Sequence, residues 1–448
     1  MARSFVINVV IGLALLFLLH TPWVQRNQAV ANARDAIITW QMARLTGVDN
    51  AANLAWIDID ESAHAAWGSS QVTRRDKVAA LIAFALRGKP AVVVVDIDET
   101  DAAPGAPLHD AALQRILRAH ERACAATSCP PVLLVRTFAP STRYVYRGRQ
   151  GYALMAQRSF LDAALGTSPN RPWNGRGVQW GSVGMDREPD LVVRRWRLWE
   201  NACNTGGKAV ITPSLMLLAA AIQNSTPLER VRAALVPHAL LCEPASEAAA
   251  SNRVAGSQVV TTLALARSTL TLSESGLDRR VFFRIPWTRA NERPGLAVVL
   301  PAESIARDPR ADAAILRGRI VVIGTSYAAS GDLHMTPLGE MPGALVLINA
   351  INSLVRGDEI HDAGWGVTVG IELGLILVVS ALFAALPAGI ALCISLGLIV
   401  TGSLTIGFVA FNSGVWLDSV IPLSGVILHE VIARTRHRTT AIFRGRRK

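Results

Sequence analysis

The sequence predicts an α/β domain with a mostly parallel sheet flanked by helices, joined to an α-helical membrane region with four transmembrane helices in all. Two observations lead to this class. Buried runs rich in Val and Ile alternate with helix-like stretches through the middle of the 448 residues. One apolar segment, 5–19, lies near the start of the sequence, and three more lie close together between residues 366 and 433.

The α/β pattern begins with a strand-like run that ends in acids and is followed by apolar residues at helical spacing, such as Val78, Leu81 and Ile82. The later Val/Ile runs do not alternate with polar residues, which is typical of strands buried on both faces of a sheet. The expected strands are 54–61, 90–97, 132–135 and 318–324, and the expected helices are 75–86 and 110–126.

Three helices are expected near the C-terminal end. Residues 366–411 contain one charge, Glu372, and are too long for a single span at about 1.5 Å per residue across a core of roughly 30 Å. Pro387 and Gly389 break the run in its middle. The predicted helices are therefore about 366–386, 389–411 and 415–433. We expect Glu372 to point toward the lipid headgroups.

The distribution of arginine predicts the orientation. Seven of the 45 basic residues follow Ala433, and no acid lies among them, so the positive-inside rule places this end in the cytoplasm. The expected organisation is a signal anchor at 1–20, an extracytoplasmic domain at 21–362, three transmembrane helices at 363–433 and a basic tail at 434–448. Cleavage near Ala31-Asn32-Ala33 is an alternative for the first segment. The arginine-rich composition favours a bacterial inner membrane, with the large domain in the periplasm.

The net charge of +11 does not indicate nucleic-acid binding, because most of the excess lies in the tail. A basic tail beside a membrane helix is attracted to anionic lipid.

Four of the five cysteines lie in the extracytoplasmic domain. An oxidising compartment allows two disulfides, and nearest-neighbour pairing joins Cys124 to Cys129 and Cys203 to Cys242. A zinc site is the alternative, but the cysteines lack the two-residue spacing of a zinc ribbon. The identity of any metal is left open.

Acidic residues follow two of the expected strands. Asp58 and Asp60 share one strand face by the period of two, as do Asp96 and Asp98, and Glu61 comes next. Since open α/β sheets bind ligands at the carboxyl ends of their strands, these side chains are candidates for binding a cation. Helix or turn capping is the alternative.

Known catalytic motifs do not occur in the sequence, so we expect no enzymatic activity and no cofactor. Residues 324–334 combine hydroxyl, acid and imidazole groups, but a loop of small and polar residues is the favoured explanation, because the members of a catalytic triad normally come from distant segments.

The first of the clustered helices carries small residues at a spacing of four, a pattern that allows close helix packing. These helix-packing candidates, which suggest a homodimer or a partner helix, are Gly366, Gly370 and Gly374. Packing against other helices of the same chain is the alternative.

The order of several short motifs resembles the type-two CHASE domain, an extracellular sensory module of bacterial cyclases and kinases. The motifs are Trp56-Ile57-Asp58-Ile59-Asp60-Glu61-Ser62, Arg74-Arg75, Gly88 to Ile97, Asp110-Ala-Ala-Leu113, Asp190-Leu-Val-Val-Arg194-Arg195, Pro213-Ser214-Leu215, Gly318 to Thr325, Asp332, Thr336-Pro337-x-Gly339 and Pro342-Gly343. The chain departs from the family at Asn349-Ala350, where a His-Ala pair is common.

The resemblance implies an extracytoplasmic sensory domain for a small-molecule or envelope ligand. Because fifteen residues follow the last helix, we expect signalling through the membrane helices to a separate effector protein. A structural or scaffolding subunit of an envelope complex is the second interpretation, and an extracytoplasmic hydrolase is the third. The candidates for ligand binding are Asp58, Asp60, Glu61, Arg75, Asp96, Asp98, Ser326 and Asp332.

Overall fold

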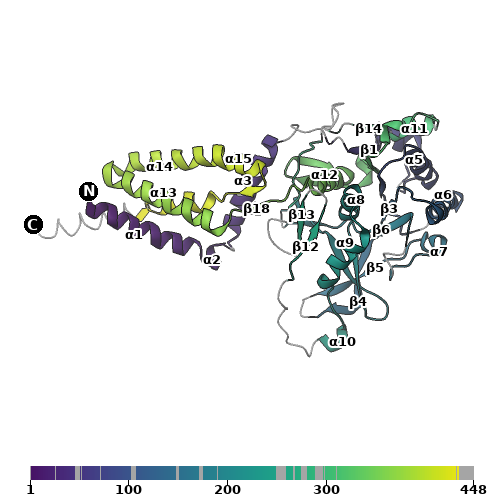
Figure 1. Ribbon diagram of the computed structural model, residues 1–448, viewed down its shortest axis with the longest axis horizontal. Coiled ribbons are helices and arrows are strands. Elements are labelled where there is room, and N and C mark those ends of the chain that lie inside the picture. Colours follow the sequence, from purple (N-terminus) through teal and green to yellow (C-terminus); the bar gives the residue numbers. More distant parts are fainter. Residues whose placement is uncertain are drawn as a thin grey trace, which may run out of the picture. The chain divides into compact units, whose positions relative to one another are not determined.

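The computed structural model divides into two compact units (Figure 1). The helical unit comprises Met1–Leu45 and Ile360–Lys448, and the α/β unit comprises Thr46–Glu359. The residues described are 2–25, 27–45, 51, 53–70, 72–101, 107–147, 151–170, 175–188, 190–248, 259–265, 268–273, 280–287, 296, 298–308, 310–429 and 431–432. The predicted basic tail lies outside the described residues.

A six-stranded parallel sheet forms the centre of the α/β unit, with strand order β14-β1-β15-β2-β3-β6. The parallel sheet confirms the predicted α/β class, and four of its strands lie in the predicted segments. The two edge strands, β6 and β14, were not predicted. The bounds are β1 (Leu54–Ile59), β2 (Val92–Asp96), β3 (Val132–Val135), β6 (Val178–Gly181), β14 (Val298–Pro301) and β15 (Ile320–Thr325).

Helices cover both faces of this sheet (Figure 1). On one face, alternate strand residues such as Ile57, Val95 and Ile323 are fully buried in one core with Val78 and Ile82 of α5. The opposite face packs against α8 and α12. The helices of the first face are α5 (Arg75–Arg87), α6 (Pro107–Ala126) and α11 (Ala302–Arg307), and those of the second are α8 (Leu215–Gln223) and α12 (Gly343–Arg356).

Smaller antiparallel elements surround the central sheet. A disulfide between Cys203 and Cys242 joins the hairpin β9–β10 to the three-stranded sheet β11-β4-β5. The strands are β4 (Phe138–Tyr146), β5 (Tyr152–Ala156), β7 (Met185–Arg187), β8 (Val193–Trp196), β9 (Trp199–Cys203), β10 (Ala209–Pro213), β11 (Cys242–Pro244), β12 (Thr261–Ala264), β13 (Thr269–Leu272), β16 (Leu333–Thr336) and β17 (Gly339–Pro342). Short helices are α4 (Glu61–Ala66), α7 (Asp162–Leu165), α9 (Leu228–Leu235) and α10 (Ala245–Ala248).

Among its described residues, the helical unit contains two helices that are long and apolar enough to cross a membrane, Trp365–Ala385 and Gly389–Asn412. Two of the four expected spans are thus candidates by length and composition, whereas Ser4–Leu19 and Val420–His429 are shorter apolar helices. The elements are α1 (Ala2–Leu19), α2 (Pro22–Gln25), α3 (Gln28–Leu45), α13 (Trp365–Ala385), α14 (Ala388–Gly402), the π-helical turn Ser403–Gly407, α15 (Phe408–Asn412), β18 (His361–Asp362) and β19 (Val415–Trp416).

The last predicted helix, 415–433, begins later than expected. Val415 and Trp416 form strand β19 instead, paired in parallel with β18. Asp418 then accepts a hydrogen bond of 3.0 Å from the backbone N–H of Val420, where the helix starts. A carboxylate that satisfies a free N–H at this point is a typical helix start, which explains why the apolar run is helical only from there.

Two features of the helical unit differ from the sequence analysis or were missed by it. Helix α3 was not predicted, and its Arg34 donates a hydrogen bond of 2.8 Å to Asp418. Glu372 does not face the headgroups as expected: it is buried among the helices, with its carboxylate 3.5 Å from Nε2 of His20. A nearby polar partner explains the difference, because burying a carboxylate alone would be costly.

Candidate functional site

Two aspartates flank one glycine at the carboxyl ends of three neighbouring strands. Asp58 of β1 and Asp96 of β2 are both in register with Gly324 of β15, the strand between them. Side chains in register on a parallel sheet point to the same face, which here is the face covered by α12. The structure therefore brings two of the predicted candidates together, across a residue that has no side chain.

Two glycines allow helix α12 to begin close to these carboxylates. A methyl group at Gly324 would lie 2.6 Å from Cβ of Ala344, in the first turn of α12. A methyl group at Gly343 would lie 2.6 Å from the carboxyl carbon of Asp332. Both distances are shorter than van der Waals contact, so only glycine fits at either position without rearrangement. The positive end of the helix dipole favours a carboxylate here.

Asp332 reaches the helix start through a tight hairpin. Strands β16 and β17 pair in antiparallel fashion, and the Thr336 hydroxyl donates a hydrogen bond of 2.7 Å to the Gly339 carbonyl. The Asp332 carbonyl accepts the N–H of Gly343 at 2.8 Å, and its carboxylate lies 2.9 Å from Nε2 of His334. We call Asp58, Asp96 and Asp332 the strand-end cluster.

Burial opposes ionisation of two members of this cluster. Burial raises the pKa of Asp58 to about 7, opposed by a hydrogen bond from Ser326 and assisted by the charge of Asp60. Burial, and then the neighbouring charge of Asp332, raise the pKa of Asp96 to about 8. Oδ1 of Asp58 is buried and accepts no hydrogen bond from the described residues. A cation placed here would offset the charge of Asp58 and Asp96, whereas Asp332 already has His334 as a neighbour at 2.9 Å.

A small hollow lies beside the end of β1, with a volume of about 10 Å³ that has room for roughly one water molecule. Its wall includes two aromatic rings that stack on each other, His64 and Tyr327, with centroids 4.0 Å apart. The Trp67 indole, which donates a hydrogen bond of 3.0 Å to Glu303, and Arg74 also line it. This hollow surrounds Ile59, on the face of the sheet that packs against α5, and is separate from the strand-end cluster on the opposite face.

Three of the predicted candidates have local structural roles. Asp60 is the N-cap of α4 and accepts the N–H of Ala63 at 2.9 Å. Glu61 accepts the N–H of Ala328 at 3.2 Å. Asp98 accepts the N–H of Thr100 at 2.9 Å and is exposed. For Asp60 and Asp98, the structure shows the capping and turn interactions that the sequence analysis left open as the alternative.

Arg75 is buried and surrounded by partners. Its guanidinium pairs with Glu99 at 2.5 Å and with Asp110 at 3.3 Å, and it donates to the Asp101 carbonyl at 2.6 Å. The arginine also lies over the Phe160 ring at 4.7 Å from the centroid. This pattern assigns Arg75 to the stability of the fold. We call Arg75, Glu99 and Asp110 the Arg75 network.

Glu99 is one of the acids that follow the expected strand 90–97, but the sequence did not single it out as a candidate, and the structure shows it fully buried. Burial raises the pKa of Glu99 to about 7, although the charge of Arg75 and its hydrogen bond act in the opposite direction. Its Oε1 accepts no hydrogen bond from the described residues. Glu99 follows β2 among other acids, and nothing local distinguishes it from the exposed Asp98.

Asn349, the position at which the sequence departs from the common His-Ala pair, is structural in this chain. Its side-chain oxygen accepts the N–H groups of Arg284 and Ile285 at 3.0 and 2.9 Å, and its amide donates to the Ile285 and Leu345 carbonyls, both at 3.0 Å. All four hydrogen bonds of the amide group are thereby satisfied, and the residue is fully buried.

The family model described as the CHASE2 domain matches residues 10–386. The chain belongs to the CHASE2 family. This finding confirms the resemblance identified from the sequence motifs. Membership of this family suggests that the protein is a membrane sensor with an extracellular sensory domain. No curated protein and no solved structure matches the chain. The CHASE2 match includes the whole strand-end cluster, the Arg75 network and the first of the two long apolar helices.

Proposed function

We propose that this CHASE2 protein is a membrane sensor that binds a small cationic ligand at the strand-end cluster and signals through its apolar helices to a separate partner protein. The observation that carries the proposal is the pair of half-buried carboxyl groups, Asp58 and Asp96, on either side of Gly324 under the first turn of α12. The carboxyl ends of strands are the usual ligand site of open α/β sheets.

A cation is the ligand class that fits the electrostatics. Each carboxyl group with a raised pKa is costly to ionise in the folded protein, and a bound ammonium group or metal ion would lower that cost. Binding at pH 7 should therefore release protons.

Helix α12 is the proposed route of the signal. Its first turn lies over the carboxylates, and its last residue, Arg356, is separated from the start of α13 at Trp365 by residues 357–364. A ligand that repositions the strand-end cluster would displace the beginning of α12, and a helix transmits such a displacement to its other end because its backbone is stiff. The segment that follows would pass the displacement to α13.

Thermal unfolding of the full-length protein at pH 7, with a panel of small amines and divalent cations, tests the ligand site. A ligand that binds only the folded state adds about 2.7 kcal/mol at a hundredfold excess over Kd. We expect Asp58→Asn and Asp96→Asn to abolish this stabilisation, and the matched control Asp98→Asn, at an exposed turn two residues after Asp96, to retain it. Stabilisation that survives both replacements would refute the proposed site.

The proposed topology places the α/β unit in the periplasm and the C-terminus in the cytoplasm, as the positive-inside rule predicts. A reporter that is active only outside the cytoplasm should be active when it is fused after Gly256 and silent when it is fused at Lys448. Activity of the outside reporter at Lys448 would overturn the orientation.

Association with another helix is the proposed means of contacting the partner. The glycines at 366, 370 and 374 are exposed, and a methyl group at any of them would meet no described atom within 4 Å. This open stripe also favours the second candidate function, a scaffolding subunit. In native membranes, the variants Gly370→Leu and Gly374→Leu should form fewer crosslinks to the partner than the wild type. The identity of the protein crosslinked to the wild type separates the two functions, because a sensor would capture a signalling enzyme and a scaffold would capture an envelope component. Undiminished crosslinking would assign the stripe another role.

A further inference from the structure

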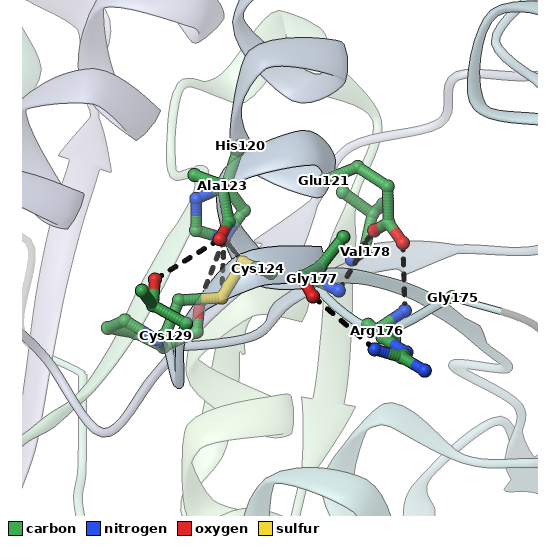
Figure 2. Close-up of a disulfide and its surroundings, with 12 residues drawn as sticks. His120, Glu121, Ala123, Cys124, Cys129, Gly175, Arg176, Gly177 and Val178 are labelled. Carbon is green, nitrogen blue, oxygen red and sulfur yellow. Dashed lines mark hydrogen bonds between the residues drawn. A yellow bond between two sulfur atoms is a disulfide. The ribbon is translucent and has the colours of Figure 1, made fainter.

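A histidine and two cysteines meet at the end of helix α6, far along the chain from the strand-end cluster. His120 and Cys124 are four residues apart and therefore lie on the same face of the helix. Cys129, in the loop after the helix, returns to this face and forms a disulfide with Cys124 (Figure 2). Nε2 of His120 lies 3.4 Å from Sγ of Cys124 and 3.9 Å from Sγ of Cys129.

The three side chains lie close enough together to bind one ion and are at least half-buried. Cys124 is buried, with 8% of its surface exposed, and the other two residues are half-buried. Nε2 of His120 also lies 2.9 Å from the Pro130 carbonyl. One ligand atom from each residue lies within 4.8 Å of the other two.

We propose that His120, Cys124 and Cys129 form a redox-controlled zinc site, in which the disulfide and the metal-bound state exclude each other. A dithiol reductant reduces the disulfide: the S–S bond breaks, both cysteines become thiols and the reductant becomes a disulfide. Zn²⁺ then binds the two sulfurs and the imidazole, and the two thiol protons are released. Reoxidation by a disulfide oxidant re-forms the S–S bond and releases the ion.

Zinc fits this ligand set because it prefers sulfur and nitrogen ligands in tetrahedral geometry and leaves a position for water when the protein supplies three ligands. Zn–S distances of about 2.3 Å require the two sulfurs to separate beyond bonding distance. Cys124 has little freedom, since a methyl group at Gly177 would lie 2.5 Å from its Sγ. The separation of the two sulfurs must therefore come from movement of Cys129, which lies in the loop. His120 Nε2 must also give up its contact with the Pro130 carbonyl in order to bind the ion.

Hydrogen bonds connect the same turn of α6 to the edge of the central sheet. Glu121, next to His120, accepts the backbone N–H groups of Arg176, Gly177 and Val178 at 2.9, 2.8 and 2.7 Å (Figure 2). Val178 is the first residue of edge strand β6. A change between disulfide and metal at the end of α6 would act directly on the start of this strand.

Cobalt binding to full-length protein in detergent tests the proposal, because Co²⁺ replaces Zn²⁺ in such sites and absorbs light when bound by thiolate. After reduction with a phosphine and removal of oxygen, the protein should bind one Co²⁺ per chain with sulfur-to-cobalt charge-transfer absorption, and Zn²⁺ should displace it. The oxidised protein should show no such absorption. Binding by the oxidised protein, or no thiolate absorption after reduction, would overturn the proposal.

Variants identify the ligands. Removing a residue that only hydrogen-bonds to a metal ligand already costs roughly 10- to 100-fold in metal affinity. Removal of a direct ligand in His120→Ala should therefore weaken Co²⁺ binding by at least about tenfold. The double variant Cys203→Ser/Cys242→Ser removes the other disulfide and should bind Co²⁺ like the wild type. If replacement of Cys124 prevents folding, alkylation of the reduced wild-type thiols should abolish binding instead. Unchanged affinity in the His120 variant, or loss of binding in the Cys203/Cys242 variant, would contradict the site.

Discussion

The strand-end cluster and the Arg75 network both bury carboxyl groups near the carboxyl end of β2, but only the network includes an arginine. In the network, the Arg75 guanidinium binds Glu99 and Asp110 directly. In the cluster, Asp58 and Asp96 have raised pKa values and lie near a third carboxylate, Asp332. The comparison teaches that a carboxyl group paired with a buried arginine has a structural role. Asp58 and Asp96 are half-buried, and burial, helped by the neighbouring charges of Asp60 and Asp332, raises their pKa values, which suits them to binding a cation.

The largest expected effect comes from breaking the network. Arg75→Met should destabilise the protein by about 3–5 kcal/mol, because it leaves two buried acids without their counterion. The preceding residue provides the control: Arg74 pairs with Asp76 at 2.8 Å near the surface, and Arg74→Met should cost about 1 kcal/mol or less. Thermal or denaturant unfolding of both variants measures the difference. Equal losses would show that burial does not separate the two arginines.

A smaller effect is expected from crowding the cluster. Gly343→Ala places a methyl group against the Asp332 carboxyl group and should cost about 1–3 kcal/mol, as overpacking usually does. Gly364→Ala is the control, because a methyl group there meets no described atom within 4 Å. Unfolding experiments should separate the two. If both variants unfold like the wild type, α12 does not rest closely on the strand ends.

The pH dependence of stability distinguishes the cluster from exposed acids. Because the folded-state pKa of Asp96 is raised to about 8, the folded protein binds more protons than the unfolded chain between about pH 4 and pH 8. This contribution to stability is therefore fully present below about pH 4 and is lost as the pH rises through 8.

Asp96→Asn removes that titration, so its stability relative to the wild type should increase by about 3–4 kcal/mol between pH 5 and pH 8, since nearly three pH units at about 1.4 kcal/mol each separate these values. Asp98→Asn should show no such trend. Unfolding free energies measured across this range provide the test, and parallel curves for the wild type and Asp96→Asn would contradict the raised pKa.

The smallest effect is expected for the capping aspartate. Asp60→Ala removes the N-cap of α4 and should cost about 1 kcal/mol, whereas Asp60→Ser should retain most of the stability. Ligand stabilisation should persist in both variants, because Asp60 is a cap in the folded protein. Loss of ligand binding in the stable Asp60→Ser protein would instead assign Asp60 to the site.

Local patterns predicted the parts of the fold that depend on short stretches of chain. Strands β1, β2, β3 and β15 were predicted because continuous apolar runs can be buried on both faces, and α13 and α14 because Pro387 interrupts a long apolar run. Helix α3 was missed, since its hydrophobic residues do not form a clear stripe. The family was recognised because several short motifs occur in a characteristic order.

The sequence by itself determined the fold class, the apolar segments and the positions of acids at strand ends, since each follows from neighbouring residues. Only the tertiary structure placed β15 between β1 and β2, which makes Asp58 and Asp96 neighbours across Gly324. It also assigned Asp60 to a cap, Arg75 to a buried network and His120 to the cysteine pair. Strand order and burial depend on contacts between distant segments, and the local pattern of residues carries no record of them.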